Sequence, residues 1–224
     1  MTVERARTTL VEIRLDDPRW PAFLGRSSGA TIFHSPAWAR TVADSYGFRG
    51  FGLGVVDANH ELRGLLPMAE VDLPFRSRRW VSLPFTDVCP PLLSPGLDQG
   101  AVEPMLELAG EEAGVSTIEV RAPLAGARLH EQGVEHVLPL GSDPDELRRR
   151  FKKQAWQKVR QAQRQNLQIR EAARPEDLLD TYYGLHLATR RRQGVPCQPR
   201  RFCVLSANSR PRFFVAPTFC RMLL

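Results

Sequence analysis

Two apolar runs joined by a short polar turn constrain the fold more than any other feature. Phe51–Val56 and Leu62–Val71 flank the turn Asp57-Ala58-Asn59-His60, a pattern typical of a β-hairpin. Sequential strands with short connections pair antiparallel. The sequence therefore predicts a mixed α/β (α+β) fold with a largely antiparallel sheet. The other predicted strands are Val11–Leu15, Arg79–Phe85, Thr117–Arg121 and Val134–Leu140.

Helices are predicted between these strands. Ser35-Pro36 pairs a cap residue with proline at the first helical position, and Gly47 marks the end of that helix. A short helix is predicted near Trp20–Leu24, and a longer one over Ala101–Ala113. These helices flank the sheet, and we expect a first domain over residues 1–141.

The charge is divided unequally along the chain. Residues 148–224 hold 18 of the 31 Lys+Arg and 4 of the 25 Asp+Glu, a net charge of +14, whereas residues 1–147 carry −8. Such an asymmetry is typical of a surface that meets polyanions, namely nucleic acid, phosphorylated substrates or anionic lipid. The alternative is a set of solvated helix faces.

The second predicted domain, residues 142–224, begins with a basic helix over Pro144–Gln165. Its apolar residues recur at helical spacing among many arginines and lysines. A strand over Leu167–Glu171 and a helix over Pro175–Gln193 follow. One strand and two helices cannot enclose a core, and the pattern breaks down after Arg201, so we expect this domain to be incomplete, with an atypical tail after residue 202.

Several classes of protein are disfavoured. The N-terminus has no signal-peptide core and no apolar run approaches the ~20 residues that span a bilayer. The four cysteines show no C-x-x-C spacing, which favours reduced thiols and a cytoplasmic location. The five histidines are scattered, so neither a catalytic triad nor a metal site is expected. Peripheral contact with an anionic membrane remains open.

Four stretches together resemble the FemAB-type transferases, whose two domains are related to the GNAT acyltransferase fold. The resemblance covers about residues 10–202. The stretches are Thr31-Ile-Phe-His-Ser-Pro-Ala-Trp-Ala-Arg40, Ser82-Leu-Pro-Phe-Thr-Asp-Val-Cys-Pro-Pro-Leu92, the basic helix with Asn166-Leu-Gln-Ile-Arg170, and His186-Leu-Ala-Thr-Arg-Arg-Arg-Gln-Gly-Val-Pro-Cys-Gln-Pro-Arg-Arg-Phe202.

This resemblance implies an amide-forming transferase that moves an aminoacyl or related acyl group onto an amine of a cell-envelope precursor. In that family the donor is aminoacyl-tRNA and the product serves peptidoglycan cross-bridges; other relatives accompany exopolysaccharide production. No bound cofactor is implied, and the partners would be a phosphorylated or nucleotide-linked precursor and tRNA. The same resemblance includes the expectation that the chain is an enzyme inactivated by truncation of its second domain.

The resemblance also implies site residues. Arg40 falls where the family places a cation for substrate phosphates. Gln198 and Phe202 stand where relatives carry Arg and Tyr, with Arg200 and Arg201 beside them.

Residue chemistry adds three candidates. Arg190 and Arg191 suit bidentate phosphate binding, although they also complete a helix C-terminus. Asp87 is a candidate to orient the acceptor amine or accept its proton, against the alternative of a loop-capping carboxylate.

Two other functions remain open. One is a non-enzymatic module that binds RNA or another polyanion through residues 148–201. The other is an acyl-CoA-dependent N-acyltransferase, because Arg191-Arg-Gln-Gly-Val-Pro196 partly matches the Arg-x-x-Gly-x-Gly loop of acetyltransferases. Pro196 removes an amide donor from that loop, which makes acyl-CoA the less expected donor.

Overall fold

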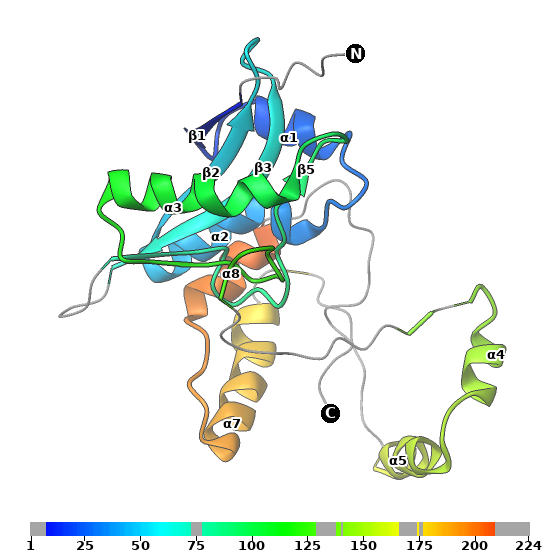
Figure 1. Cartoon of the computed structure of the whole chain (residues 1–224). Helices are drawn as coiled ribbons and strands as arrows, with labels where there is room; N and C mark the ends of the chain where they lie inside the picture. The colour runs from blue at the N-terminus through cyan, green and yellow to red at the C-terminus, as the bar shows by residue number, and fades with distance from the viewer. Residues whose placement is uncertain are drawn as a thin grey trace.

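The computed structural model describes residues 8–72, 78–128, 138–139, 141–165, 174 and 177–208. Its centre is a mixed α/β unit whose sheet has the order β1-β2-β3-β4-β6, with β5 paired to β3 beside this path (Figure 1). Every strand pair is antiparallel except β4–β6, which is parallel. The strands are β1 (Thr9–Ile13), β2 (Arg49–Val56), β3 (Leu62–Val71), β4 (Arg79–Val81), β5 (Leu92–Leu93) and β6 (Thr117–Glu119).

Helices cover the sheet and extend beyond it. The predicted mixed fold with a largely antiparallel sheet and flanking helices is confirmed. The α-helices are α1 (Arg19–Leu24), α2 (Pro36–Tyr46), α3 (Val102–Ala113), α4 (Pro144–Arg149), α5 (Lys153–Arg164), α7 (Tyr183–Gln193) and α8 (Arg200–Asn208). The 3-10 turns are η1 (Ile32–His34) and η2 (Gln99–Ala101), and η3 (Leu178–Tyr182) is π-helical.

The sheet has a core on each face. Helices α1 and α2 pack on one face, where Trp20 and Leu65 are buried, and α3 packs on the other, where Leu106 and Leu66 are buried. Strand β3 contributes successive residues to both cores, which explains its nearly unbroken apolar run. Helix α3 also provides the crossover that a parallel β4–β6 pair requires.

The predicted hairpin and the helix after Ser35-Pro36 are confirmed. Leu53 of β2 pairs with Leu66 of β3. The Ser35 side chain accepts the N–H of Trp38, and Gly47 ends α2 in the left-handed conformation with φ of 74°. Ser35 and Gly47 therefore fix both ends of the helix that carries much of the candidate site.

The predicted strand Arg79–Phe85 is wrong in its second half. Strand β4 ends at Val81, because Leu83 and Phe85 adopt φ of 57° and 63°, values that no β-strand accommodates. Pro84 lies between them and supplies no N–H for a ladder.

The predicted continuous helix from Pro144 to Gln165 is also wrong. Arg150–Lys152 interrupt it, with Lys152 extended at ψ of 151°. A continuous helix would place Arg149 one turn from Lys153, and such like-charge neighbours destabilise a helix. Trp156 instead folds back and donates its indole N–H to the carbonyl of Arg148 at 3.3 Å.

The end of the described chain departs from the prediction too. The sequence predicts that regular secondary structure breaks down after Arg201, whereas in the structure α8 continues to Asn208. This helix packs against α2 of the first predicted domain, and Figure 1 shows α7 projecting away from the sheet below it. The predicted strands over residues 134–140 and 167–171 lie outside the described residues, apart from 138 and 139, as does the tail after 208.

Candidate functional site

The candidate site forms at the ends of β4 and β6, where the parallel pair gives way to loops. The backbone N–H of Ser82 donates to the carbonyl of Glu119 at 2.8 Å, and that of Cys89 donates to the carbonyl of Arg121 at 2.8 Å. The Ser82 hydroxyl accepts the N–H of Arg121 at 2.7 Å. These bonds anchor both ends of the loop 82–91, which carries Asp87.

This loop has a strained backbone. Leu83 is fully buried and Phe85 is 51% exposed, yet both are left-handed, a conformation that costs a bulky residue about 1–3 kcal/mol. Such residues cluster at functional sites. The ring of Phe85 stacks on Tyr46 of α2 with centroids 4.2 Å apart. Burial raises the pKa of Tyr46 to about 12, so this phenol is neutral at physiological pH.

His34 ties the loop to the segment before α2. It is fully buried, and its Nε2 lies 2.9 Å from the carbonyl of Pro90, which only accepts. Nε2 therefore carries the proton and Nδ1 accepts from the backbone N–H of Thr31 at 3.1 Å. Burial lowers the pKa of His34, so the imidazole is a neutral structural link rather than a general base.

Cys89 is also structural. Its buried thiol donates to the carbonyl of Phe33 at 3.9 Å. Burial raises the pKa of Cys89 to about 12, and a thiol with so little thiolate is no nucleophile at neutral pH.

The third contributor is the start of α8. The ring of Phe202 meets Trp38 of α2 edge-on with centroids 5.8 Å apart, and Tyr46 at 6.2 Å. Trp38 in turn donates its indole N–H to the buried hydroxyl of Thr86 at 2.9 Å. Segments near residues 31–46, 82–91 and 200–202 thus converge on one face of α2.

Three of the candidate residues lie on these converging segments, and a fourth, Gln198, lies just before the last of them. Asp87 is exposed and follows Thr86 directly, while Arg200 and Arg201 are exposed and precede Phe202. Arg200 pairs with Asp180 at 3.1 Å in a largely exposed ion pair. Gln198 faces inward, with its Oε1 2.7 Å from Nε2 of His186.

The other three candidates lie elsewhere. Arg40 is two residues after Trp38, which turns it about 160° away around α2 at ~100° per residue. The pKa of Asp16 is lowered, mainly by the hydrogen bond from Arg14 and less by Arg40, which places Arg40 near the end of β1. Arg190 and Arg191 occupy the far end of α7, about 15 Å along the helix from Asp180 at ~1.5 Å per residue.

Sequence reasoning missed the polar partners behind the site. His186 is buried, stacks on Tyr182 with centroids 5.6 Å apart and bonds Gln198, while its Nδ1 has no partner among the described residues. Tyr183 donates to the carbonyl of Gln198 at 3.3 Å. The helical spacing of Tyr182 and His186 was the available signal, since residues four apart share a helix face.

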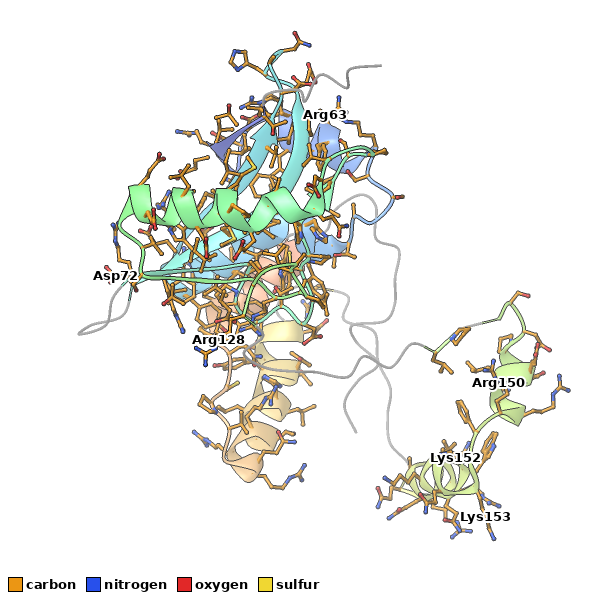
Figure 2. All side chains as sticks on the ribbon, viewed as in Figure 1. Arg63, Asp72, Arg128, Arg150, Lys152 and Lys153 are labelled. Atoms are coloured by element: carbon orange, nitrogen blue, oxygen red, sulfur yellow. The ribbon has the colours of Figure 1, made fainter. Side chains whose placement is uncertain are left out.

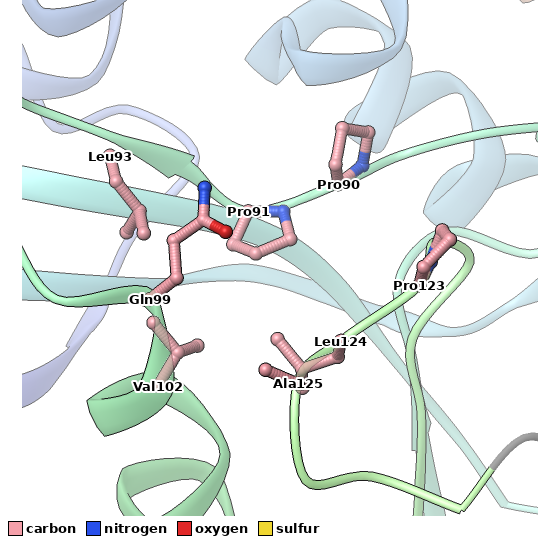
Figure 3. Close-up of a pocket in the computed structure, with 8 residues that line it drawn as sticks. All are labelled: Pro90, Pro91, Leu93, Gln99, Val102, Pro123, Leu124 and Ala125. Atoms are coloured by element: carbon pink, nitrogen blue, oxygen red, sulfur yellow. The ribbon is translucent and has the colours of Figure 1, made fainter.

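One pocket opens between the loop and α3 (Figure 3). Its volume of about 80 Å³ is below the ~300 Å³ of ordinary ligand pockets. It is lined mainly by apolar side chains: Pro90, Pro91, Leu93, Gln99, Val102, Pro123, Leu124 and Ala125. Within the ranges that the structure describes, no three His, Cys, Asp or Glu side chains are grouped to hold a metal ion.

Comparison with known proteins finds only weak similarity. No family model matches the chain, and no curated protein matches its sequence. Among solved structures, a ribosomal-protein-alanine N-acetyltransferase from Brucella melitensis biovar Abortus 2308 is similar at 11% identity and a TM-score of 0.36, over 60% of this chain and 100% of that one. A mutant of the BH1408 protein from Bacillus halodurans is similar at 16% identity and a TM-score of 0.35, over 58% and 98%. These values do not assign the chain to a family.

Proposed function

We propose that the chain is an amide-forming N-acyltransferase of the FemAB-like type, which moves an aminoacyl or acyl group onto the amine of a phosphorylated cell-envelope precursor. The observation that carries the proposal is the convergence on α2. Three of the four stretches that resemble the family meet there through the contacts of Trp38 with Thr86 and Phe202. Segments brought together from residues 31–46, 82–91 and 200–202 form a composite surface that carries Asp87 and Arg201.

The chemistry of this surface suits acyl transfer from an activated donor. An aminoacyl ester or thioester needs an oriented amine more than a nucleophile on the enzyme. Asp87 would orient the amine and accept its proton, and Arg201 would hold a phosphate through its planar guanidinium fork. The neutral His34 and Cys89 support the loop and take no part in the chemistry.

The test is transfer by the purified full chain to a nucleotide-linked peptide with a free amine. Charged tRNA and acyl-CoA serve as alternative donors, and the product is the amide measured by mass spectrometry. We expect Asp87→Asn to lower kcat about 100-fold. We expect Arg201→Gln to raise KM for the phosphorylated acceptor about tenfold with little change in kcat.

Glutamine variants of two further arginines distinguish the site predicted by the fold from the site predicted by the sequence. The resemblance predicts that Arg40→Gln also weakens acceptor binding, and residue chemistry predicts the same for Arg191→Gln, whereas the positions of both residues in the fold predict unchanged KM. Circular dichroism and thermal unfolding confirm that each variant is folded. Absence of transfer from every donor by folded protein would overturn the proposal, and full activity of Asp87→Asn would remove Asp87 from it.

A further inference from the structure

Helices α4 and α5 form an arm that stands apart from the sheet and from α7 and α8 (Figure 1). None of the residues of either helix is buried. The arm is held internally: Phe151 packs against Trp156 with centroids 5.9 Å apart, and Trp156 donates to the carbonyl of Arg148. These two aromatic contacts fix α5 relative to α4.

The arm carries a concentrated positive charge. Helix α5 has four cations and no acidic residue. Arg148 and Arg149 pair with Asp145 and Asp143, but none of the following cations forms an ion pair with another described residue. Figure 2 shows Arg150, Lys152 and Lys153 on this arm, away from the rest of the protein. The cations without an ion pair among the described residues are Arg150, Lys152, Lys153, Lys158, Arg160 and Arg164.

An apolar stripe runs along the same helix. At ~100° per residue, Ala155, Trp156, Val159 and Ala162 fall within an arc of about 120°, in which Gln163 near the helix end is the one polar residue. Phe151, which precedes α5, packs against Trp156 of this stripe and is 39% exposed, and Val159 lies in the stripe at 36% exposure. Lys158 and Arg160 border the stripe on either side, each about 40° from its edge at the same angular spacing. A cationic helix with a bordered apolar stripe is the arrangement of helices that lie in a membrane interface.

We propose that the α4–α5 arm binds the surface of an anionic lipid bilayer. Helix α5 lies in the plane of the interface with Trp156 and Val159 among the acyl chains, and Lys158 and Arg160 reach the phosphates on either side. Of the helices that the structure describes, none has the length and apolar character to cross a bilayer. This inference stands independently of the proposed transfer activity.

Two other occupants fit these observations less well. An RNA backbone complements the cations but leaves the exposed apolar stripe without a role. The C-terminal residues 209–224 are apolar but carry three arginines and no acidic residue, so their charge opposes that of α5. Anionic lipid complements both the charge and the stripe.

The test uses full-length protein and vesicles of phosphatidylglycerol and phosphatidylcholine, with pure phosphatidylcholine as the neutral comparison. Brominated acyl chains quench a tryptophan that enters the bilayer. Trp20 and Trp80 are buried at 0% and 4% exposure and Trp38 is half-buried, so quenching is expected to come from Trp156. Trp156→Phe keeps an aromatic ring in the stripe, and we expect it to bind with most of the quenching abolished.

A pair of matched substitutions tests the stripe itself. Val159→Glu places a charge in the stripe and is expected to lower the vesicle partition coefficient at least tenfold. Leu108→Glu makes a similar change at an exposed position on α3 (57% exposure) and is expected to leave binding within twofold of the unsubstituted protein. Replacing Lys158 and Arg160 by Gln should cost about fivefold for each cation, and added salt should weaken binding.

Three results would overturn the proposal. The first is failure to bind anionic vesicles, including the case in which a short RNA duplex binds tightly and equally to the Val159→Glu variant. The second is vesicle binding that Val159→Glu leaves unchanged. The third is a lower melting temperature of Val159→Glu combined with Trp156 emission that is already blue-shifted before vesicles are added, because the stripe would then be packed inside the protein.

Discussion

The link between Trp38 and Thr86 makes a quantitative prediction about the loop that carries Asp87. Trp38→Phe keeps a ring beside Phe202 but removes the N–H that donates to the Thr86 hydroxyl at 2.9 Å. Thr86 is 1% exposed, so its hydroxyl then loses a partner where water does not reach. The substitution should therefore loosen the loop 82–91 while the sheet stays folded.

The expected size follows from the buried bond. A neutral hydrogen bond contributes about 0.5–1.5 kcal/mol, and an unsatisfied buried hydroxyl costs about 1–3 kcal/mol. We expect the free energy of opening the loop to fall by about 1–2 kcal/mol, which raises the open population roughly 5–30-fold. Thr86→Val in the Trp38→Phe background should add little, because both partners are then absent.

Alkylation of Cys89 measures this opening directly. The thiol is fully buried and burial raises its pKa to about 12, so it reacts only when the loop opens. Mass spectrometry of the Cys89 peptide gives the rate, and the partly exposed Cys197 and Cys203 serve as internal references. An unchanged Cys89 rate in Trp38→Phe would refute the coupling, as would additive effects of the two substitutions.

Three further predictions concern stability. Burial lowers the pKa of His34 below the ordinary value near 6.5, so the unfolded chain takes up a proton that the native imidazole does not bind. The free energy of unfolding should therefore fall as the pH drops below about 6.5. Urea unfolding measures this dependence, and His34→Gln should flatten it below about pH 6.5. Gly54→Ala should destabilise by about 1–3 kcal/mol, because its Cβ would lie 2.6 Å from Cγ1 of Ile13; urea unfolding should show this loss with an unchanged m-value. Gly184→Ala meets no atom within 4 Å and should stabilise α7 by up to about 1 kcal/mol, seen as a higher melting temperature; a loss of stability would contradict the described helix.

Local signals predicted much of the sheet unit. The cap Ser35, the terminator Gly47 and the turn at Asp57–His60 act over a few residues, so the sequence defined α2 and the β2–β3 hairpin closely. Strand β1 is displaced by two residues from its prediction. The prediction of a continuous helix over 144–165 was wrong because the periodicity of apolar residues carries no information about repulsion between neighbouring cations. The prediction that β4 extends to Phe85 was wrong because the left-handed backbone at Leu83 and Phe85 is imposed by surrounding contacts and not by these residues themselves.

The candidate site shows a different limit. Residue chemistry identified arginines that suit phosphate, but it could not say which of them share a surface. Arg201 reaches the site because its neighbour Phe202 packs on Trp38, a contact between residues far apart in the sequence, whereas Arg200 is turned toward Asp180. Arg191 is close to Arg200 in the sequence, yet it lies in the last turn of α7, at the far end of that helix from Asp180, the ion-pair partner of Arg200.

Helical phase on α2 explains why the resemblance and the fold disagree about Arg40. A helix that packs on a sheet with one face, here through Ala39 and Val42, has only the remaining surface for other partners. Trp38 uses one flank of that surface to hold the loop 82–91 and α8, and Arg40 emerges near the other flank at the end of β1. One ligand that touches both Arg40 and Arg201 would have to pass around α2. Binding by Arg201 with no contribution from Arg40 is therefore the arrangement that this packing favours, and equal KM effects of the two glutamine variants would require α8 to dock elsewhere when ligand is bound.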